Sequence, residues 1–251
     1  MATTGRRATI GDVASAAEVS RATVSRVLNG ADTVDPALAR RVRSAAERLG
    51  YRPNLTALGL ARGFTGMVGV IVPDLANPFF PELLKAIEAA AGAEDSRVLV
   101  ADSNEDEEQE ARLVEELSRR CDGLILCSLR MSRPALRRIA KTNTPMVLAN
   151  RIEPGLGIPG AATDVDEVVR TLVRHLAELG HTHVAYLAGP DHSWSEARRR
   201  QAVRAACRTA RLHSTVVAAG STTADGYAAA AALAGREVTA VIGFNDLVVF
   251  G

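Results

Sequence analysis

Apolar side chains recur with the spacing of an α-helix in three short stretches at the start of the chain. The first stretch has apolar residues at positions 10, 13, 14 and 17, and the second has them at positions 24, 27 and 28. A third helix is predicted to begin at Asp35-Pro36, an N-cap residue followed by proline in the first turn, and to end at Gly50. Only a few residues separate the first two helices. Two short helices joined this tightly, with a third packed behind them, are typical of a helix-turn-helix.

Beyond residue 65 the pattern changes to short β-rich runs that alternate with helical stretches. The first series predicts strands at 67–72, 98–101, 124–127 and 146–149, with helices at 78–91, 105–119 and 134–141. The second series predicts helices at 168–179, 196–210 and 226–234 and strands at 184–188, 215–218 and 238–244. Alternating strands and helices indicate parallel sheets with helices on both faces. We therefore expect an α/β body of two doubly wound lobes, with a ligand site at the carboxyl ends of the strands.

The second lobe shows three predicted strands, whereas a doubly wound half normally has about five. We expect this lobe to be incomplete and the chain to be truncated by about two βα units of ~30 residues each. The last strand would then have an uncovered edge and face. The response of such a chain to a ligand is expected to be impaired.

Charge changes the picture, because it is distributed unevenly. Residues 1–64 hold ten arginines and five acidic residues, a net charge of +5, and the other 20 basic and 24 acidic residues give −4, so that the total is +1. A compact basic head on an acidic body favours a polyanion-binding module, and the alternative is a chance distribution of solvated charges. The hydrophobic content of 47% supports a folded core. The apolar runs are far shorter than the ~20 residues that span a bilayer.

Signals for catalysis or metal binding are weak. The glycine pattern at 155–160 matches a dinucleotide-binding fingerprint, but intervening residues separate it from the preceding strand and the following helix. The histidines at 181, 183 and 192 are not expected to form a metal site, and the serines beside His192 lack the geometry of a catalytic triad. Three cysteines without redox or metal spacing (Cys121, Cys127 and Cys207) predict reduced thiols. We expect a cytoplasmic, nucleoid-associated protein that is not an enzyme, carries no metal or cofactor and makes no membrane contact.

The second helix presents a candidate nucleic-acid surface. Its apolar residues must face the core, which turns Arg21, Ala22 and Arg26 outward, where a recognition helix meets base edges in the major groove. Arg26 is the candidate for a bidentate contact to guanine. Hydroxyl and amide side chains suited to phosphate contacts lie nearby, at Thr9, Ser20, Thr23, Ser25 and Asn29. The alternative interpretation is an ordinary polar helix face.

The stretch ATIGDVASAAEVSRATVSRVLNGADTV, followed by LGYRPN, resembles the DNA-binding head of the LacI/GalR family of transcriptional repressors over residues 8–64. The resemblance implies that Arg21 and Ala22 occupy the family's two variable base-reading positions and that Arg26 is the shared guanine reader. It also implies backbone contacts by Tyr51 and Asn54. In that family a linker becomes a short helix on operator DNA and inserts a leucine into the minor groove, and this hinge maps here to Ala57 and Leu60. We expect a head at 1–52 and a hinge at 53–65.

This sequence departs from the family pattern at three places. Glu18 stands where the family usually has the glycine of the turn, which questions the geometry between the first two helices. Leu38 and Ala39 replace a Thr-Arg pair, which removes a phosphate contact. Leu58 and Gly59 replace a common arginine and a small polar residue in the hinge. We expect weaker DNA affinity than is typical of the family.

The body also resembles this family, whose effector domain is similar to periplasmic sugar-binding proteins. The resemblance is carried by GVIVPDLANPFFPEL, LAELGHTHVAYLAGP and GFNDLVVFG. It implies a first lobe at 66–160, a partial second lobe at 161–251, and a set of effector-binding residues: Phe79, Phe80, Asn150, Arg198, Asn245 and Asp246. Guanidinium, carboxylate and amide groups between aromatic walls suit a polyhydroxylated ligand.

These patterns together predict a sequence-specific DNA-binding transcriptional regulator, expected to be a repressor. Its partners are expected to be double-stranded operator DNA and a small-molecule effector, most simply a carbohydrate. One head reads one half-site, so a homodimer on a near-palindromic operator follows from the geometry. The alternatives are a solute-binding protein or enzyme that uses only the body, and a truncated remnant without regulated DNA binding.

Overall fold

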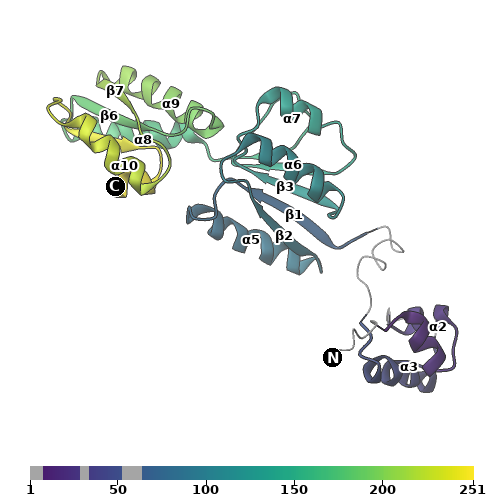
Figure 1. Ribbon diagram of the computed structural model, residues 1–251. Coiled ribbons are helices and arrows are strands. Elements are labelled where there is room, and N and C mark those ends of the chain that lie inside the picture. Colours follow the sequence, from purple (N-terminus) through teal and green to yellow (C-terminus); the bar gives the residue numbers. More distant parts are fainter. Residues whose placement is uncertain (1–7, 29–33, 53–63) are drawn as a thin grey trace. The chain divides into compact units, whose positions relative to one another are not determined.

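The computed structural model describes residues 8–28, 34–52 and 64–251. It divides the chain into two compact units, Met1–Thr65 and Gly66–Gly251. The described residues of the first unit form three helices, and the second unit consists of two α/β lobes (Figure 1). None of the helices in the described residues is long and apolar enough to cross a membrane.

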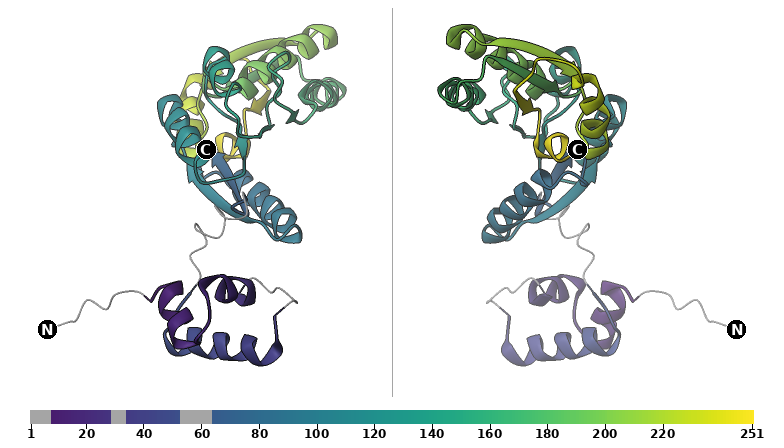
Figure 2. Two further views of the ribbon diagram at one scale, coloured as in Figure 1. Left: turned by 90° about the vertical axis from the view of Figure 1, so that its right-hand side faces the viewer. Right: turned by 90° about the vertical axis from the view of Figure 1, so that its left-hand side faces the viewer.

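The head, drawn in purple to blue in Figure 2, consists of α1 (Ile10–Ala16), α2 (Arg21–Leu28) and α3 (Pro36–Arg48). A capping box fixes the start of α1, because the Thr9 hydroxyl accepts from the Asp12 amide while the Asp12 carboxylate accepts from the Thr9 amide. Asp35 caps α3 by accepting from the amides of Ala37 and Leu38. The three helices bury one small core of valines and alanines, with Val13, Val24 and Val42 at its centre.

The first lobe is built on a parallel five-stranded sheet in the order β2-β1-β3-β4-β5. Its strands are β1 (Met67–Val72), β2 (Arg97–Asp102), β3 (Gly123–Cys127), β4 (Met146–Ala149) and β5 (Gly160–Ala161). Helix α5 (Phe79–Ala93) covers one face of the sheet, and α6 (Glu107–Ser118) and α7 (Arg133–Ile139) cover the other. The sequence predicts the first four strands, whereas β5 has only two residues and lies in a segment expected to be a loop.

The second lobe has a parallel three-stranded sheet in the order β7-β6-β8. Its strands are β6 (His183–Ala188), β7 (His213–Ala218) and β8 (Ala240–Gly243). Helices α8 (Val165–Glu178) and α9 (Trp194–Ala210) pack on one face, and α10 (Thr223–Ala230) and the short α11 (Asp246–Phe250) lie over the other. The predicted fold class, a helical head with a body of two parallel α/β lobes and a small second sheet, is therefore confirmed.

All strands within each sheet run parallel, so their carboxyl ends meet at one edge of the sheet. The loops at those edges carry the polar side chains described below. In the first lobe these loops follow β1, β2, β3 and β4, and in the second lobe they follow β6, β7 and β8.

Candidate nucleic-acid interface and ligand site

The exposed face of α2 carries the three predicted base-reading residues. Val24 and Val27 are buried in the head, whereas Arg21, Ala22 and Arg26 are exposed. A regular helix that buries every third or fourth residue turns the positions between them to solvent. The head therefore presents two arginines and a small side chain on one helical surface, which is an arrangement suited to reading base edges.

Two of the hydroxyl groups predicted to contact phosphates, those of Thr9 and Ser20, cap α1 and α2. The Ser20 hydroxyl accepts from the Thr23 amide at 3.1 Å and lies 2.9 Å from the Thr23 hydroxyl, while Thr9 belongs to the capping box of α1. A hollow of about 630 Å³ lies between these two helix starts, lined by Thr9, Gly11, Asp12, Ala14, Ser15, Glu18, Val19, Ser20 and Arg21. The amides at the start of α2 and the Arg21 guanidinium favour an anion in this hollow, whereas the Asp12 carboxylate at the start of α1 opposes one.

Two of the residues predicted to contact DNA are partly buried, and four lie outside the described residues. Ser25 is half-buried on α2, and Tyr51 packs against the core of the head after α3. Asn29, Asn54, Ala57 and Leu60 lie outside the described residues. The DNA contacts assigned to all six residues remain predictions.

The turn between α1 and α2 adopts the geometry of a glycine turn despite the glutamate at its centre. Glu18 has a φ angle of 53°, in the left-handed region that glycine adopts most easily. The Arg41 guanidinium of α3 donates to the Ala17 carbonyl and lies 3.6 Å from the Glu18 carboxylate. A side chain from α3 thus satisfies the end of α1. The altered turn residue therefore leaves the two helices connected as in a helix-turn-helix.

Replacing Glu18 with glycine is expected to stabilise the head by about 0.5–1 kcal/mol, because glycine relieves the left-handed backbone. Amide hydrogen exchange in α1 and α2 of the full chain would measure the change. Glu18→Ala is the matched control, since it removes the charge but keeps the Cβ atom. Equal protection in the glycine and alanine variants would contradict the strain argument.

In the first lobe, the loop that follows β3 is fixed by a buried carboxylate. Glu110 on α6 is fully buried and accepts from the backbone amides of Arg130 and Met131 at 2.8 Å each. The Ser103 hydroxyl lies 3.5 Å away on the other side of the carboxylate. Burial raises the pKa of Glu110 to about 7, although the two backbone hydrogen bonds and the charges of Arg130 and Arg151 act in the opposite direction.

A buried guanidinium holds the carbonyl groups of the same loop. Arg151, which follows β4, donates through Nη1 to the carbonyls of Leu129 and Met131 at 2.8 Å each. Its charge is balanced by Glu153, which also accepts from Arg133 at 2.7 Å. The loop between β3 and α7 is therefore fixed through its amides by Glu110 and through its carbonyls by Arg151.

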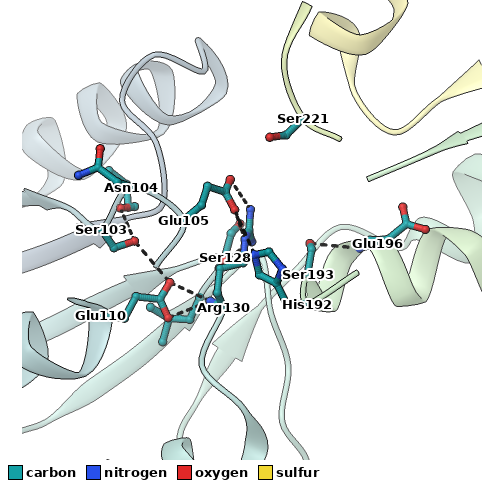
Figure 3. A network of polar contacts seen from close by, with 12 residues as sticks. Ser103, Asn104, Glu105, Glu110, Ser128, Arg130, His192, Ser193, Glu196 and Ser221 are labelled. Atoms are coloured by element: carbon teal, nitrogen blue, oxygen red, sulfur yellow. Dashed lines mark hydrogen bonds and ion pairs between the residues drawn. The ribbon is translucent and has the colours of Figure 1, made fainter. Parts of the chain in front are cut away.

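The fixed loop directs Arg130 toward the second lobe. The Arg130 guanidinium binds the Glu105 carboxylate through two nitrogens, and Glu105 lies 4.0 Å from the imidazole of His192 in the second lobe (Figure 3). Asn150 follows β4 with a φ angle of 58° and donates to the Ser128 hydroxyl at 2.8 Å. These polar groups come from three loops of the first lobe, and among them Glu105 contacts the loop after β6.

The loop after β6 in the second lobe is organised by a second buried carboxylate. Glu196 accepts from the Tyr186 hydroxyl at 2.6 Å, from the Gly189 amide at 2.7 Å and from Arg200 at 2.7 Å. Ser193 caps α9 and accepts from the Glu196 amide. Glu196 therefore connects β6, the loop after it and α9, and His192 lies in this loop.

Arg199 lies at the carboxyl end of β8. Its guanidinium donates to the Phe244 carbonyl at 2.9 Å and covers the Phe244 ring at 4.7 Å from the centroid. Burial lowers the pKa of Arg199, while Tyr186, Glu196 and Asp246 oppose this effect. Asn245 caps α11 and donates to the Ser221 carbonyl at 2.9 Å, and Asp246 beside it is exposed.

The structure brings some of the predicted ligand residues to the strand ends and places others elsewhere. Phe79, Asn150, Asn245 and Asp246 lie on loops or helix starts at those ends, and Phe79 is 49% exposed. Phe80 is buried against Val70 and Val72 beneath α5, and Arg198 pairs with Asp166 of α8 at 2.8 Å. The ligand roles of all six remain predictions, and for the arginine the neighbouring Arg199 has the more suitable position.

Sequence reasoning missed Glu105, Arg130, His192 and Arg199. Glu105 was hidden in an acidic run that also starts a helix, and Arg199 is the middle member of three consecutive arginines. The available signal was positional, because all but Arg199 lie in loops directly after or close to predicted parallel strands.

Two sequence profiles of known families match the chain. The profile of bacterial regulatory proteins of the lacI family matches residues 9–54, and that of periplasmic binding proteins and the sugar binding domain of the LacI family matches residues 65–251. The chain is 38% identical over 182 residues to catabolite control protein A of Priestia megaterium, covering 72% of this chain and 55% of that protein. It is 36% identical over 244 residues to the HTH-type transcriptional regulator GalS of Salmonella typhimurium, covering 95% and 72%. The chain thus spans about half the length of the first of these relatives.

Solved structures show the same similarity. The lac repressor dimer bound to operator and the anti-inducer ONPF matches with a TM-score of 0.85 and 26% identity, covering 97% of this chain and 75% of that chain. A complex of the transcriptional regulator CelR with cellobiose matches with a TM-score of 0.64 and 29% identity, covering 96% and 75%.

Proposed function

Because the chain belongs to the LacI family of bacterial regulatory proteins, we propose that it is a sequence-specific DNA-binding transcriptional repressor controlled by a small ligand. The observation that carries the proposal is the surface of α2, where Arg21, Ala22 and Arg26 are exposed on a helix whose valines are buried. A second arginine-bearing helix, α3, fixes the turn that sets the angle of α2. The exposed residues would enter the major groove, and the starts of α1 and α2 would bind phosphates.

In this proposal the protein acts as a homodimer on a near-palindromic operator, with one head on each half-site. One recognition helix covers only a few base pairs, so two heads related by a twofold axis supply the specificity that one lacks. The relative solved with operator, the lac repressor, is described as a dimer. In this proposal Asn54, Ala57 and Leu60 belong to the hinge that contacts the backbone and the minor groove.

The proposed ligand is a neutral polyhydroxylated molecule, such as a sugar, bound at the strand ends of the two lobes. Two arginines there already have carboxylate partners within the protein, since Arg130 pairs with Glu105 and Arg200 pairs with Asp191 and Glu196. A charged ligand would have to compete with these pairs, whereas hydroxyl groups can add hydrogen bonds to them. The CelR complex with cellobiose shows a carbohydrate on a relative of this fold.

Selection of genomic fragments by the purified 251-residue chain tests the proposal. We expect enrichment of one near-palindromic sequence, and gel-shift affinity for that sequence that exceeds the affinity for scrambled DNA of the same length by at least about 10³-fold. Addition of single neutral mono- and disaccharides would then identify a ligand that changes this affinity. Binding of sugar without any sequence preference for DNA would instead support the solute-binding alternative.

A further inference from the structure

One side-chain contact joins the two lobes at their strand ends. The His192 Nε2 atom in the loop after β6 lies 4.0 Å from an oxygen of Glu105, in the loop after β2 (Figure 3). The Glu105 side chain is 25% exposed and the His192 side chain is 54% exposed. Water and protons therefore reach both partners of this pair.

The position of Glu105 is fixed from within the first lobe. Two nitrogens of the buried Arg130 guanidinium bind its carboxylate, and the amide of Arg130 is in turn held by Glu110. Glu105 also has a φ angle of 62°, so its backbone is committed to a specific turn. On the other side, the loop that carries His192 is tied to Glu196 through the Gly189 amide. Both partners are thus presented by rigid supports rather than by free loops.

The charges around His192 are mainly negative on the side of the first lobe. Glu105 faces it directly, and Glu107 lies close enough that the charge of His192 contributes to lowering the pKa of Glu107, after the larger effect of the hydrogen bonds from Ser132. Arg130 is the opposing cation, and Glu105 already neutralises it. In its own loop His192 is next to Asp191, which pairs with Arg200 at 2.8 Å.

We propose that Glu105 and His192 form a proton-dependent latch that favours contact between the two lobes when the imidazole is charged. An imidazole is the side chain that ordinarily changes its charge between pH 5 and 8. Its protonated form is attracted by Glu105 and Glu107, and its neutral form leaves only a weak polar contact. The consequence for ligand affinity rests on the function proposed above, because the ligand would bind between the same loops.

The pH dependence of the contact between the lobes has a defined direction. Lowering the pH adds a proton to the imidazole, so the population in which the lobes touch increases. Because the pair is partly exposed, the ratio of closed to open molecules is expected to change by about two- to fivefold between pH 8 and pH 5.5. Burial raises the pKa of Glu110 to about 7, so Glu110 also titrates in this range, and its protonation removes the cost of a buried charge and stabilises the fold of the first lobe.

Single-molecule energy transfer between the two lobes of the full chain tests the latch without DNA or ligand. Dyes would be attached at Asn143→Cys in the first lobe and Arg208→Cys in the second, both exposed positions. The three native thiols are buried and burial raises their pKa values, so they react slowly with maleimide. We expect a higher fraction of molecules with short distances at pH 5.5 than at pH 8, in the absence of any effector.

Four single variants and one double variant make the test specific. His192→Gln should remove, and Glu105→Gln should reduce, the contribution of the imidazole to the pH dependence, and the double variant should behave like His192→Gln. Glu108→Gln removes an exposed carboxylate from α6, three residues beyond Glu105, and should leave the pH dependence unchanged. A pH response that persists in His192→Gln but disappears in Glu110→Gln would assign it to Glu110 and overturn the latch, as would the absence of any response in the parent chain. Since the readout involves no DNA, failure of the latch and failure of the proposed regulatory function remain distinguishable.

Discussion

Replacing Arg151 with methionine is expected to destabilise the first lobe by about 3–5 kcal/mol, because it removes one member of a buried ion pair and leaves the other unbalanced. The carboxylate of Glu153 would keep only Arg133 as a partner. The carbonyls of Leu129 and Met131 would lose the donor that now satisfies both. Amide hydrogen exchange in β3 and β4 of the full chain would report the loss as a lower opening free energy.

The matched control is Arg137→Met, which removes an exposed arginine from α7 and should change the opening free energy by less than about 0.5 kcal/mol. A second variant that combines Arg151→Met with Glu153→Met should recover part of the loss, since two apolar side chains no longer leave a charge unpaired. A small effect of Arg151→Met alone would mean that the loop after β3 does not depend on the ion pair.

Arg151 and Glu110 together fix the backbone of the loop between β3 and α7 at the strand ends. Each acts on the backbone of the same loop, one through carbonyls and the other through amides. The buried Arg130 side chain of that loop then binds the partly exposed Glu105. Buried charged residues on α6 and after β4 thus help to fix the position of Glu105 at the strand ends.

The fold could be predicted to a large extent because local signals and global packing agree. The alternation of strands and helices from residue 66 onward reflects two sheets with helices on both faces, and the predicted cap at Asp35 marks a helix start that the structure contains. The two-residue strand β5 escaped prediction because it is an edge pairing set by the neighbouring β4 rather than by its own residues. Strand pairing of this kind depends on tertiary contacts that no local pattern encodes.

The residues of the candidate site were harder to predict from the sequence, because several of their positions depend on tertiary packing. A helical register predicts which side of α2 is exposed, so Arg26 could be placed from the spacing of Val24 and Val27 alone. The orientation of Arg198 and Arg199 depends on the packing of α9 against α8, β6 and β7, and a one-residue shift turns a side chain by about 100°. In the structure this shift places Arg198 against Asp166 and Arg199 at the end of β8. The pairing of Glu105 with Arg130 joins residues 25 positions apart and has no motif.

Replacing Arg26 with alanine is expected to weaken binding to the selected DNA sequence by about 1–3 kcal/mol, or roughly 5- to 150-fold, and to relax the preference at one base pair in each half-site. The side chain is exposed on α2, and its removal leaves the buried stripe of that helix intact. A guanidinium can donate two parallel hydrogen bonds to guanine, and alanine donates none. Titrations on the selected sequence, on its single-base variants and on scrambled DNA would measure the change at fixed salt.

Arg43→Ala removes the same charge from an exposed position on α3 and should leave the base preference intact. If Arg26→Ala weakens binding equally on selected and scrambled DNA, Arg26 contacts the phosphate backbone rather than a base, and the assignment of α2 as the reading helix would have to rest on Arg21 alone.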